Sequence, residues 1–188
     1  MNIALSRIEE IAACRKMDPR VVLQGYQVSG NEVVVPTEKA LKALSDVLLV
    51  PESDLSGTPQ AETSDLDAGV RVYRASEGFK RTVERKGKAY YTYQHLATTK
   101  DAPELMALKV TLLCDQPESV TLNDGHGSKE LIYVIDGSVR MDWDDADGSR
   151  HTSMLNKGDS VYLQPGIPHS FAASDAKAEI IAVNYNLA

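Results

Sequence analysis

The chain has 188 residues, of which 43% are apolar, and this is enough to bury the core of a folded domain. Its 20 Lys and Arg residues against 27 Asp and Glu give a formal net charge of −7, which argues against a general binder of nucleic acid or of anionic membranes. No run of about 18 apolar residues occurs, and the opening MNIALSRIEEIAAC lacks a leader pattern. We therefore expect neither secretion nor membrane spanning, and a cytoplasmic location.

Residues 1–50 carry apolar side chains at helical spacing and predict a small helical module. Thr37, followed by Glu38, has the chemistry of a helix start, and Pro51 that of a helix stop. Asp18-Pro19 predicts the start of another short helix. Two stripes carry the pattern, one of Ile3, Leu5, Ile8, Ile11 and Ala12 and one of Leu41, Leu44, Val47 and Leu48.

Residues 51–67, PESDLSGTPQAETSDLD, are rich in acidic and turn residues and predict a linker. From 68 to 188 the pattern changes to short runs of Val, Ile, Leu and Tyr separated by Gly, Pro, Asp and Asn, which is typical of a β-sandwich or barrel. The fold class is therefore α+β, a helix-turn-helix-like module followed by an all-β domain. The predicted strands are VRVYRA, YYTYQHLA, LMALKVTLLC, ELIYVI, SVRMDW, SVYLQP and EIIAVNY.

Two of the four histidines lie in unusual contexts. His126 precedes Glu130 by four residues, and in a continuous strand the two would stand about 13 Å apart, too far to share an ion. The intervening Gly-Ser-Lys allows a turn that brings them together. His169 ends the rigid segment Pro165-Gly166-Ile167-Pro168, which fixes its direction. Cys14 and Cys114 form no CxxC or metal pair, and we expect buried thiols without a chemical role.

The spacing of these residues resembles the paired motifs of the cupin superfamily, whose fold is a small jelly-roll β-barrel. The first motif is His126-x3-Glu130-x6-Gly137, and the second is Gly158-x6-Pro165-Gly166-x2-His169. Asp124 stands where many cupins carry another histidine, which leaves two histidines and one carboxylate. That set suits non-haem Fe(II) and leaves coordination positions open. His151 is expected to be exposed, and His95 is left without a role.

Three tyrosines, Tyr90, Tyr91 and Tyr93, follow a basic stretch that contains Arg85. Strand periodicity places Tyr91 and Tyr93 on one face and Tyr90 on the other, so two phenol hydroxyls could point into one cavity. Packing of aromatic residues in a strand explains the same pattern. Arg85 could bind an anionic oxygen group, although a cluster of charges is also typical of a solvated turn.

Further features narrow the resemblance to the 2-hydroxypropylphosphonate epoxidases, which form the antibiotic fosfomycin. These are Lys16-Met17-Asp18, Arg85 before Tyr-Tyr-x-Tyr, Asn123 before the first ligand, Pro-His169-x-Phe171 and the closing Ile-Ala-Val-Asn-Tyr. The resemblance implies a homotetramer that removes hydrogen from the phosphorus-bearing carbon of (S)-2-hydroxypropylphosphonate and closes an epoxide. It also implies hydrogen peroxide as the oxidant, a peroxidase-type reaction of class EC 1.11.1.

The same resemblance assigns the site residues. Fe(II) would be held by His126, Glu130 and His169, and Glu130 and Lys16 would be catalytic. The phosphonate would be bound by Arg85, Tyr91, Tyr93, Asn123 and a Lys16 donated by a neighbouring subunit, with Tyr90 and Phe171 as pocket walls.

Two alternatives remain open. A helical module joined to a cupin is also the plan of helix-turn-helix transcriptional regulators, but residues 1–50 hold six basic and six acidic residues, which weakens an interpretation as a DNA reader. Another cupin oxygenase is the other alternative. We expect no nucleic-acid partner, and a gel-shift assay at low salt would test this expectation.

Overall fold

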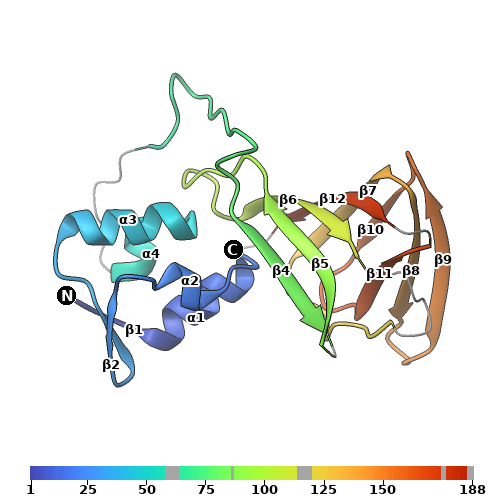
Figure 1. Cartoon of the computed structure of the whole chain (residues 1–188), viewed down its shortest axis with the longest axis horizontal. Helices are drawn as coiled ribbons and strands as arrows, with labels where there is room; N and C mark the ends of the chain where they lie inside the picture. The colour runs from blue at the N-terminus through green and yellow to red at the C-terminus, as the bar shows by residue number, and fades with distance from the viewer. Residues whose placement is uncertain (58–63, 86, 114–119, 175–176, 186–188) are drawn as a thin grey trace. The chain divides into compact units, whose positions relative to one another are not determined.

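The computed structural model describes residues 1–57, 64–85, 87–113, 120–174 and 177–185 (Figure 1). The chain divides into two compact units, one of Met1–Tyr73 with Ala97–Pro103 and the other of Arg74–Leu96 with Glu104–Ala188. Within the segment 51–67, for which we predict a linker, helix α4 (Glu52–Ser56) places Leu55 in a buried position. The described residues include no helix long and apolar enough to cross a membrane.

The N-terminal unit contains the predicted helices, α1 (Leu5–Cys14), α2 (Pro19–Val22) and α3 (Glu38–Leu48). The side chain of Asp18 accepts a hydrogen bond from the N–H of Arg20, and that of Thr37 accepts one from Ala40, so both predicted helix starts are confirmed. The two stripes are buried at Ile8, Ile11, Ala12, Leu41, Leu44 and Leu48. Val47, in contrast, is 44% exposed, and Cys14 is exposed where we expected a buried thiol.

This unit also holds a small sheet that helical spacing did not predict. Its strands are β1 (Asn2–Ala4), β2 (Gln27–Ser29) and β3 (Glu32–Val34), in the order β1-β3-β2. Gly30 takes a φ of +59° in the tight turn of the β2–β3 hairpin, a conformation in which glycine is favoured.

The second unit is a β-sandwich of two sheets around one apolar core, and it confirms the predicted cupin fold. The first sheet runs in the order β10 (Ser160–Leu163), β7 (Lys129–Asp136), β12 (Ala178–Tyr185), β6 (Leu105–Leu112), β5 (Lys88–His95) and β4 (Lys80–Arg85). The second sheet runs in the order β11 (His169–Ala173), β8 (Ser138–Asp144) and β9 (Arg150–Asn156). Inward-facing residues alternate along β6, β7 and β12, as half-buried strands require.

The prediction of a strand at residues 70–75 is wrong. This segment forms only an isolated bridge between Asp67 and Val70, and Val70 and Val72 are 60% and 63% exposed. Its Val-x-Val alternation imitates a strand, but it has neither a pairing strand along its length nor a core to face. The guanidinium of Arg71 instead lies 5.6 Å from the ring centroid of Tyr73.

Candidate metal centre

The two predicted motifs come together through a close approach of two glycines. Gly125 has a φ of +77°, and a Cβ at this position would lie 2.5 Å from the carbonyl oxygen of Gly166. The N–H of Gly166 donates to the carbonyl of His126 at 2.9 Å. The loop that ends at His169 therefore packs directly against the loop that carries His126, and the chain then bends through Gly127 and Ser128 into β7. This bend confirms the turn predicted between the first two ligands.

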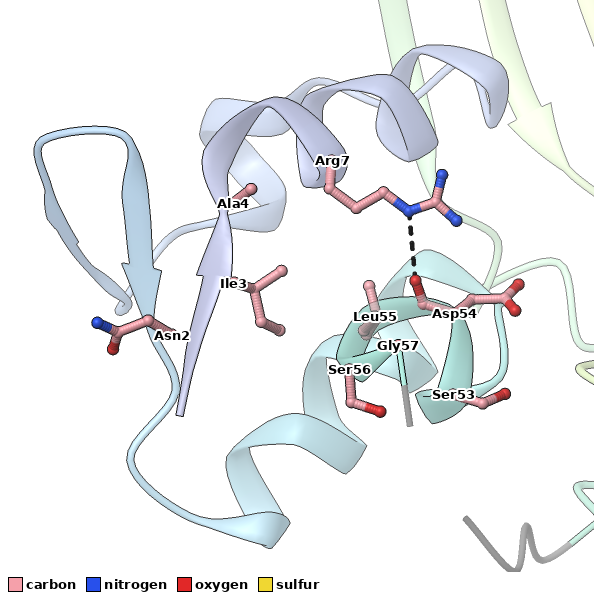
Figure 2. Close-up of a pocket in the computed structure, with 9 residues that line it drawn as sticks. All are labelled: Asn2, Ile3, Ala4, Arg7, Ser53, Asp54, Leu55, Ser56 and Gly57. Atoms are coloured by element: carbon pink, nitrogen blue, oxygen red, sulfur yellow. Dashed lines mark hydrogen bonds between the residues drawn. The ribbon is translucent and has the colours of Figure 1, made fainter. Parts of the chain in front are cut away.

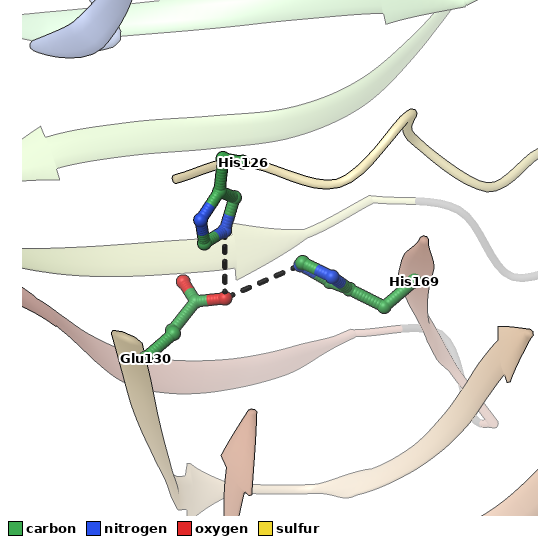
Figure 3. A group of neighbouring side chains, drawn as sticks. All are labelled: His126, Glu130 and His169. Carbon is green, nitrogen blue, oxygen red and sulfur yellow. Dashed lines mark hydrogen bonds and ion pairs between the residues drawn. The ribbon is translucent and has the colours of Figure 1, made fainter. Parts of the chain in front are cut away.

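Three side chains converge at this point (Figure 3). The Nε2 atoms of His126 and His169 each lie 3.2 Å from Oε2 of Glu130. One ligand atom from each residue lies within 4.8 Å of the others, a grouping that could hold a metal ion. Glu130 is 7% exposed and His169 5%, while His126 is half-buried. Glu130 comes from β7 and His169 from the first position of β11, so the two sheets both contribute.

The hydrogen bonds of His169 fix which nitrogen carries its proton. Its Nδ1 lies 2.8 Å from the carbonyl oxygen of Ile167, which can only accept, so Nδ1 carries the hydrogen. A neutral imidazole in this tautomer has its lone pair on Nε2, the atom that faces Glu130. The histidine is thus oriented as metal-ligating histidines are.

The charge of Glu130 completes the case for a cation. Burial by itself would raise the pKa of Glu130, but the hydrogen bonds and positive charge of His126 and His169 outweigh burial and lower its pKa to about 2. Oε2 of this carboxylate faces the Nε2 atoms of both histidines at 3.2 Å. A divalent ion bound by these three atoms would balance the negative charge of Glu130 with both histidines neutral. The residues present fit a metal ion of the non-haem iron type.

Asn123 is tied to the same histidine. Its Oδ1 accepts from the backbone N–H groups of His169 and Gly125, both at 2.9 Å, so the orientation of the amide is fixed. Its Nδ2 then lies 3.1 Å from Nε2 of His169 and donates to the lone pair that a metal would take. An ion at Nε2 would release this N–H for another acceptor.

The tyrosines lie differently from the prediction. Tyr90 is the extra residue of a β-bulge, because Val83 pairs with Tyr91 and Glu84 with Ala89. The bulge breaks the alternation of faces, so the hydroxyls of Tyr90 and Tyr91 both reach Oγ of Ser170, at 2.9 and 3.0 Å. The prediction that Tyr90 takes the opposite face is therefore wrong.

Tyr91 and Tyr93 share a face as predicted, with ring centroids 5.7 Å apart. The hydroxyl of Tyr91, however, is bonded to the backbone of Phe171, and burial raises the pKa of this phenol. Phe171 is itself buried, and its ring centroid lies 5.7 Å from that of His169.

The two predicted cationic groups lie in different units. Arg85 ends β4 and pairs with Lys88, and its side chain lies outside the described part of the structure. Lys16 follows α1 in the N-terminal unit with a φ of +56°. Their contacts with a substrate remain predictions.

The two other histidines are not part of the metal group. His95 is buried with its ring centroid 6.1 Å from that of Phe79. His151 is exposed, as predicted, and it stacks on Trp143 and bonds Asp145 at 2.8 Å.

A separate groove of about 460 Å³ lies in the N-terminal unit, between β1, the start of α1 and α4 (Figure 2). The Nε of Arg7 donates there to the carbonyl of Asp54 at 3.3 Å, and the guanidinium also pairs with Glu10. Nε and Nη1 of this arginine are thus directed to protein groups, and we assign the groove no function.

The sequence prediction missed two polar residues beside the ligands, Ser128 and Asn184. Oγ of Ser128 lies 2.8 Å from Nδ1 of His126, and Nδ2 of Asn184 donates to Oε1 of Glu130 at 3.2 Å. A signal for Asn184 exists in the sequence, because it follows Ile180 and Ala182 on the inward face of β12, where a polar residue needs a buried partner.

Comparison with known proteins agrees with this geometry. The Cupin domain model matches residues 112–184. The chain is 35% identical over 130 residues to (S)-2-hydroxypropylphosphonic acid epoxidase of Streptomyces wedmorensis, an alignment that covers 68% of this chain and 65% of that protein. It is 30% identical over 171 residues to methylphosphonate synthase of Nitrosopumilus maritimus, covering 84% of this chain and 35% of that protein. The chain thus spans less than two thirds of either curated relative.

Solved structures of the epoxidase match over more of the chain. The crystal structure of Fe(II) hydroxypropylphosphonic acid epoxidase with the alternative substrate (S)-1-HPP has a TM-score of 0.63 at 28% identity, and covers 96% of this chain and 93% of that one. The epoxidase from S. wedmorenis has a TM-score of 0.60 at 27% identity, and covers 96% of both chains.

The second unit has the fold of a cupin domain, and two histidines and one carboxylate within it form a group that could hold a metal ion. Among the proteins compared, the chain is similar in sequence and in fold to (S)-2-hydroxypropylphosphonic acid epoxidase.

Proposed function

We propose that this protein is a mononuclear non-haem iron enzyme that acts on phosphonates, and that it converts (S)-2-hydroxypropylphosphonate to the epoxide fosfomycin. The observation that carries the proposal is the convergence of His126, Glu130 and His169 within 4.8 Å of one another, in a chain similar to that epoxidase. When bound, Fe(II) would supply the redox chemistry for removing hydrogen from carbon. With only three protein ligands, positions remain open for a substrate that chelates through its hydroxyl and a phosphonate oxygen.

The balance of the reaction requires a two-electron oxidant. The substrate loses the hydrogen of the phosphorus-bearing carbon and the hydroxyl proton, and its own oxygen closes the ring. Hydrogen peroxide accepts the two electrons and both hydrogens and becomes two molecules of water, so the reaction is of the peroxidase type.

The protein's part is to bind and orient the dianionic phosphonate. Such a group is best bound by charged, N–H and O–H donors, and we assign this role to Arg85, Lys16, the hydroxyl of Tyr93 and the N–H of Asn123 that metal binding would release. Tyr91 is a substrate ligand only if its hydroxyl leaves the backbone of Phe171.

Two further assignments concern the surroundings of the site. Tyr90 and Phe171 form walls beside it. Lys16 would reach the site from a neighbouring subunit, which requires an oligomer, and we propose a homotetramer.

The test is anaerobic loading with Fe(II), addition of (S)-2-hydroxypropylphosphonate and peroxide, and phosphorus NMR of the products. We expect fosfomycin from the wild type, and from Glu130→Ala neither bound Fe(II) nor product with an unchanged circular dichroism spectrum. The exposed Glu9→Ala is the matched control and should behave as the wild type.

The likeness to methylphosphonate synthase, over 84% of this chain, makes that activity the second candidate. Fosfomycin and methylphosphonate differ in phosphorus NMR. A product other than the epoxide, or epoxide from Glu130→Ala, contradicts the proposed reaction.

A further inference from the structure

We infer that Ser128 and Asn184 form a hydrogen-bonded relay that positions two of the three metal ligands, His126 and Glu130. The inference rests on the proposed metal centre and deepens it. Ser128 is 6% exposed and Asn184 2%, so their polar atoms depend on protein partners. These partners are the ligands themselves and each other.

The orientation of the Asn184 amide follows from Glu130. Asn184 lies directly opposite Glu130 in the pairing of β12 with β7. Its nearby amide atom, 3.2 Å from Oε1, must be the nitrogen, because a carboxylate only accepts. The amide oxygen, Oδ1, is therefore turned toward Ser128, whose Oγ donates to it at 3.1 Å.

This donation fixes the tautomer of His126. Ser128 has one hydroxyl hydrogen, and that hydrogen is given to Asn184, so at its 2.8 Å contact with Nδ1 of His126 the serine oxygen must accept. Nδ1 of His126 thus carries the ring hydrogen, and the lone pair of the neutral imidazole lies on Nε2, which faces Glu130. An interior chain of three hydrogen bonds runs from His126 through Ser128 and Asn184 to Glu130.

The relay also acts on the carboxylate. The Asn184 N–H occupies Oε1, while Oε2 is the oxygen shared with both histidines. Glu130 is thereby held to offer one oxygen to an ion. A carboxylate that binds through one oxygen leaves an additional coordination position for an incoming ligand. Ser128 and Asn184 are positioning residues, since they act through the ligands.

The experiment is a double-mutant cycle on metal affinity, with Co(II) as the probe and visible absorption as the readout. We expect Ser128→Ala and Asn184→Leu each to weaken Co(II) binding by about 10- to 100-fold. The double variant should bind Co(II) only slightly more weakly than the single variant with the lower affinity, because both changes break the same series of hydrogen bonds. Losses that multiply would show two independent residues and overturn the relay. Ser128→Thr keeps the hydroxyl and should restore affinity.

A matched control comes from a pair with the same chemistry elsewhere in the fold. Ser138 donates to Oδ1 of Asn156 at 3.2 Å on the surface of the β8–β9 hairpin. Ser138→Ala and Asn156→Ala should leave Co(II) affinity unchanged. A loss there equal to that of Ser128→Ala would mean that the effect comes from general destabilisation.

A second readout uses the metal-free protein and no phosphonate. Nitrogen-15 NMR of the histidine rings should show the Nδ1–H tautomer for neutral His126 in the wild type and a shift toward Nε2–H in Ser128→Ala. An unchanged tautomer overturns the inference. A wild type that binds no Co(II) would overturn the metal centre instead, and the NMR result would still decide the relay.

Discussion

The hydroxyl of Tyr91 bridges the peptide groups of Phe171, accepting from its N–H and donating to its carbonyl, both at 2.9 Å. Phe171 lies on β11, at the edge of the three-stranded sheet and two residues beyond His169. A phenol from the other sheet therefore takes the place of a neighbouring strand at this edge. This contact links the tyrosine strand to the strand that presents a metal ligand.

Tyr91→Phe should consequently destabilise the second unit. The change leaves a buried N–H and a buried carbonyl without their partner, at a cost of about 1–3 kcal/mol each. Thermal unfolding should show a clear fall in Tm, whereas Tyr162→Phe, at a residue 56% exposed, should not. Equal Tm values for Tyr91→Phe and the wild type would show that the bridge does not stabilise the fold.

Gly125→Ala should reduce both stability and metal affinity. A methyl group at this position meets the carbonyl oxygen of Gly166 at 2.5 Å, so the two ligand-bearing loops must separate. Gly148 is a matched control, since it has nearly the same φ, +78°, and an added Cβ there meets nothing within 4 Å. Both variants carry the cost of a positive φ, about 1–2 kcal/mol, and only Gly125→Ala should also lose Co(II) affinity. Parallel losses of affinity in both variants would contradict the loop contact.

The ion pair between Asp46 and the buried Lys100 predicts a pH dependence of the N-terminal unit. Nζ of Lys100 lies 2.8 Å from Oδ1 of Asp46. Partial burial would raise the pKa of Asp46, but its hydrogen bond to Lys100 and the charges of Lys100 and Lys42 lower it. A lowered pKa in the folded state adds stability above the ordinary aspartate value, and this stability is lost as pH falls through the folded pKa.

Asp46→Asn should therefore lower the Tm at pH 7, and the gap from the wild type should narrow as pH drops below about 4. The control variant Asp147→Asn, at an exposed residue, should have nearly the same Tm as the wild type across this pH range. A gap for Asp46→Asn that stays constant from pH 7 to 3 would rule out the ion pair as its source.

Lys16→Ala tests the role assigned to the N-terminal unit. We expect weaker phosphonate binding, by about tenfold or more, with unchanged Fe(II) content, because a lost charge-assisted hydrogen bond costs about 1.5–3 kcal/mol and Lys16 is not a ligand of the ion. Kinetics and metal analysis would separate the two effects, and the exposed Lys39→Ala is the control. If Lys16→Ala has wild-type KM and kcat, the lysine takes no part in the site.

The metal group could be predicted from sequence because its spacing encodes its geometry. Gly125 permits the close approach of the loops, and Pro165-Gly166 directs His169. In contrast, β4, β9 and β11 of the second unit were not predicted. Each lies at the edge of its sheet, and their sequences, KRTVER, RHTSMLN and HSFAA, lack the apolar alternation of a half-buried strand.

Two other features depend on register, which the sequence does not state. The bulge at Tyr90 turns this residue to the side of Tyr91, and no single residue type marks it. The contact of Asn184 with Glu130 joins positions 54 apart and exists only in one pairing of β12 with β7. Side-chain alternation identifies the inward positions, but the partner across the strands comes from the fold.

Because Glu130 belongs to the six-stranded sheet and His169 to the three-stranded sheet, an ion bound by both would cross-link the two sheets of the sandwich. At a free-metal concentration a hundredfold above its dissociation constant, this cross-link adds about 2.7 kcal/mol to the free energy of unfolding. A chelator would then lower the thermal stability of the second unit as well as stop the reaction, so the Tm would report how much iron the protein carries.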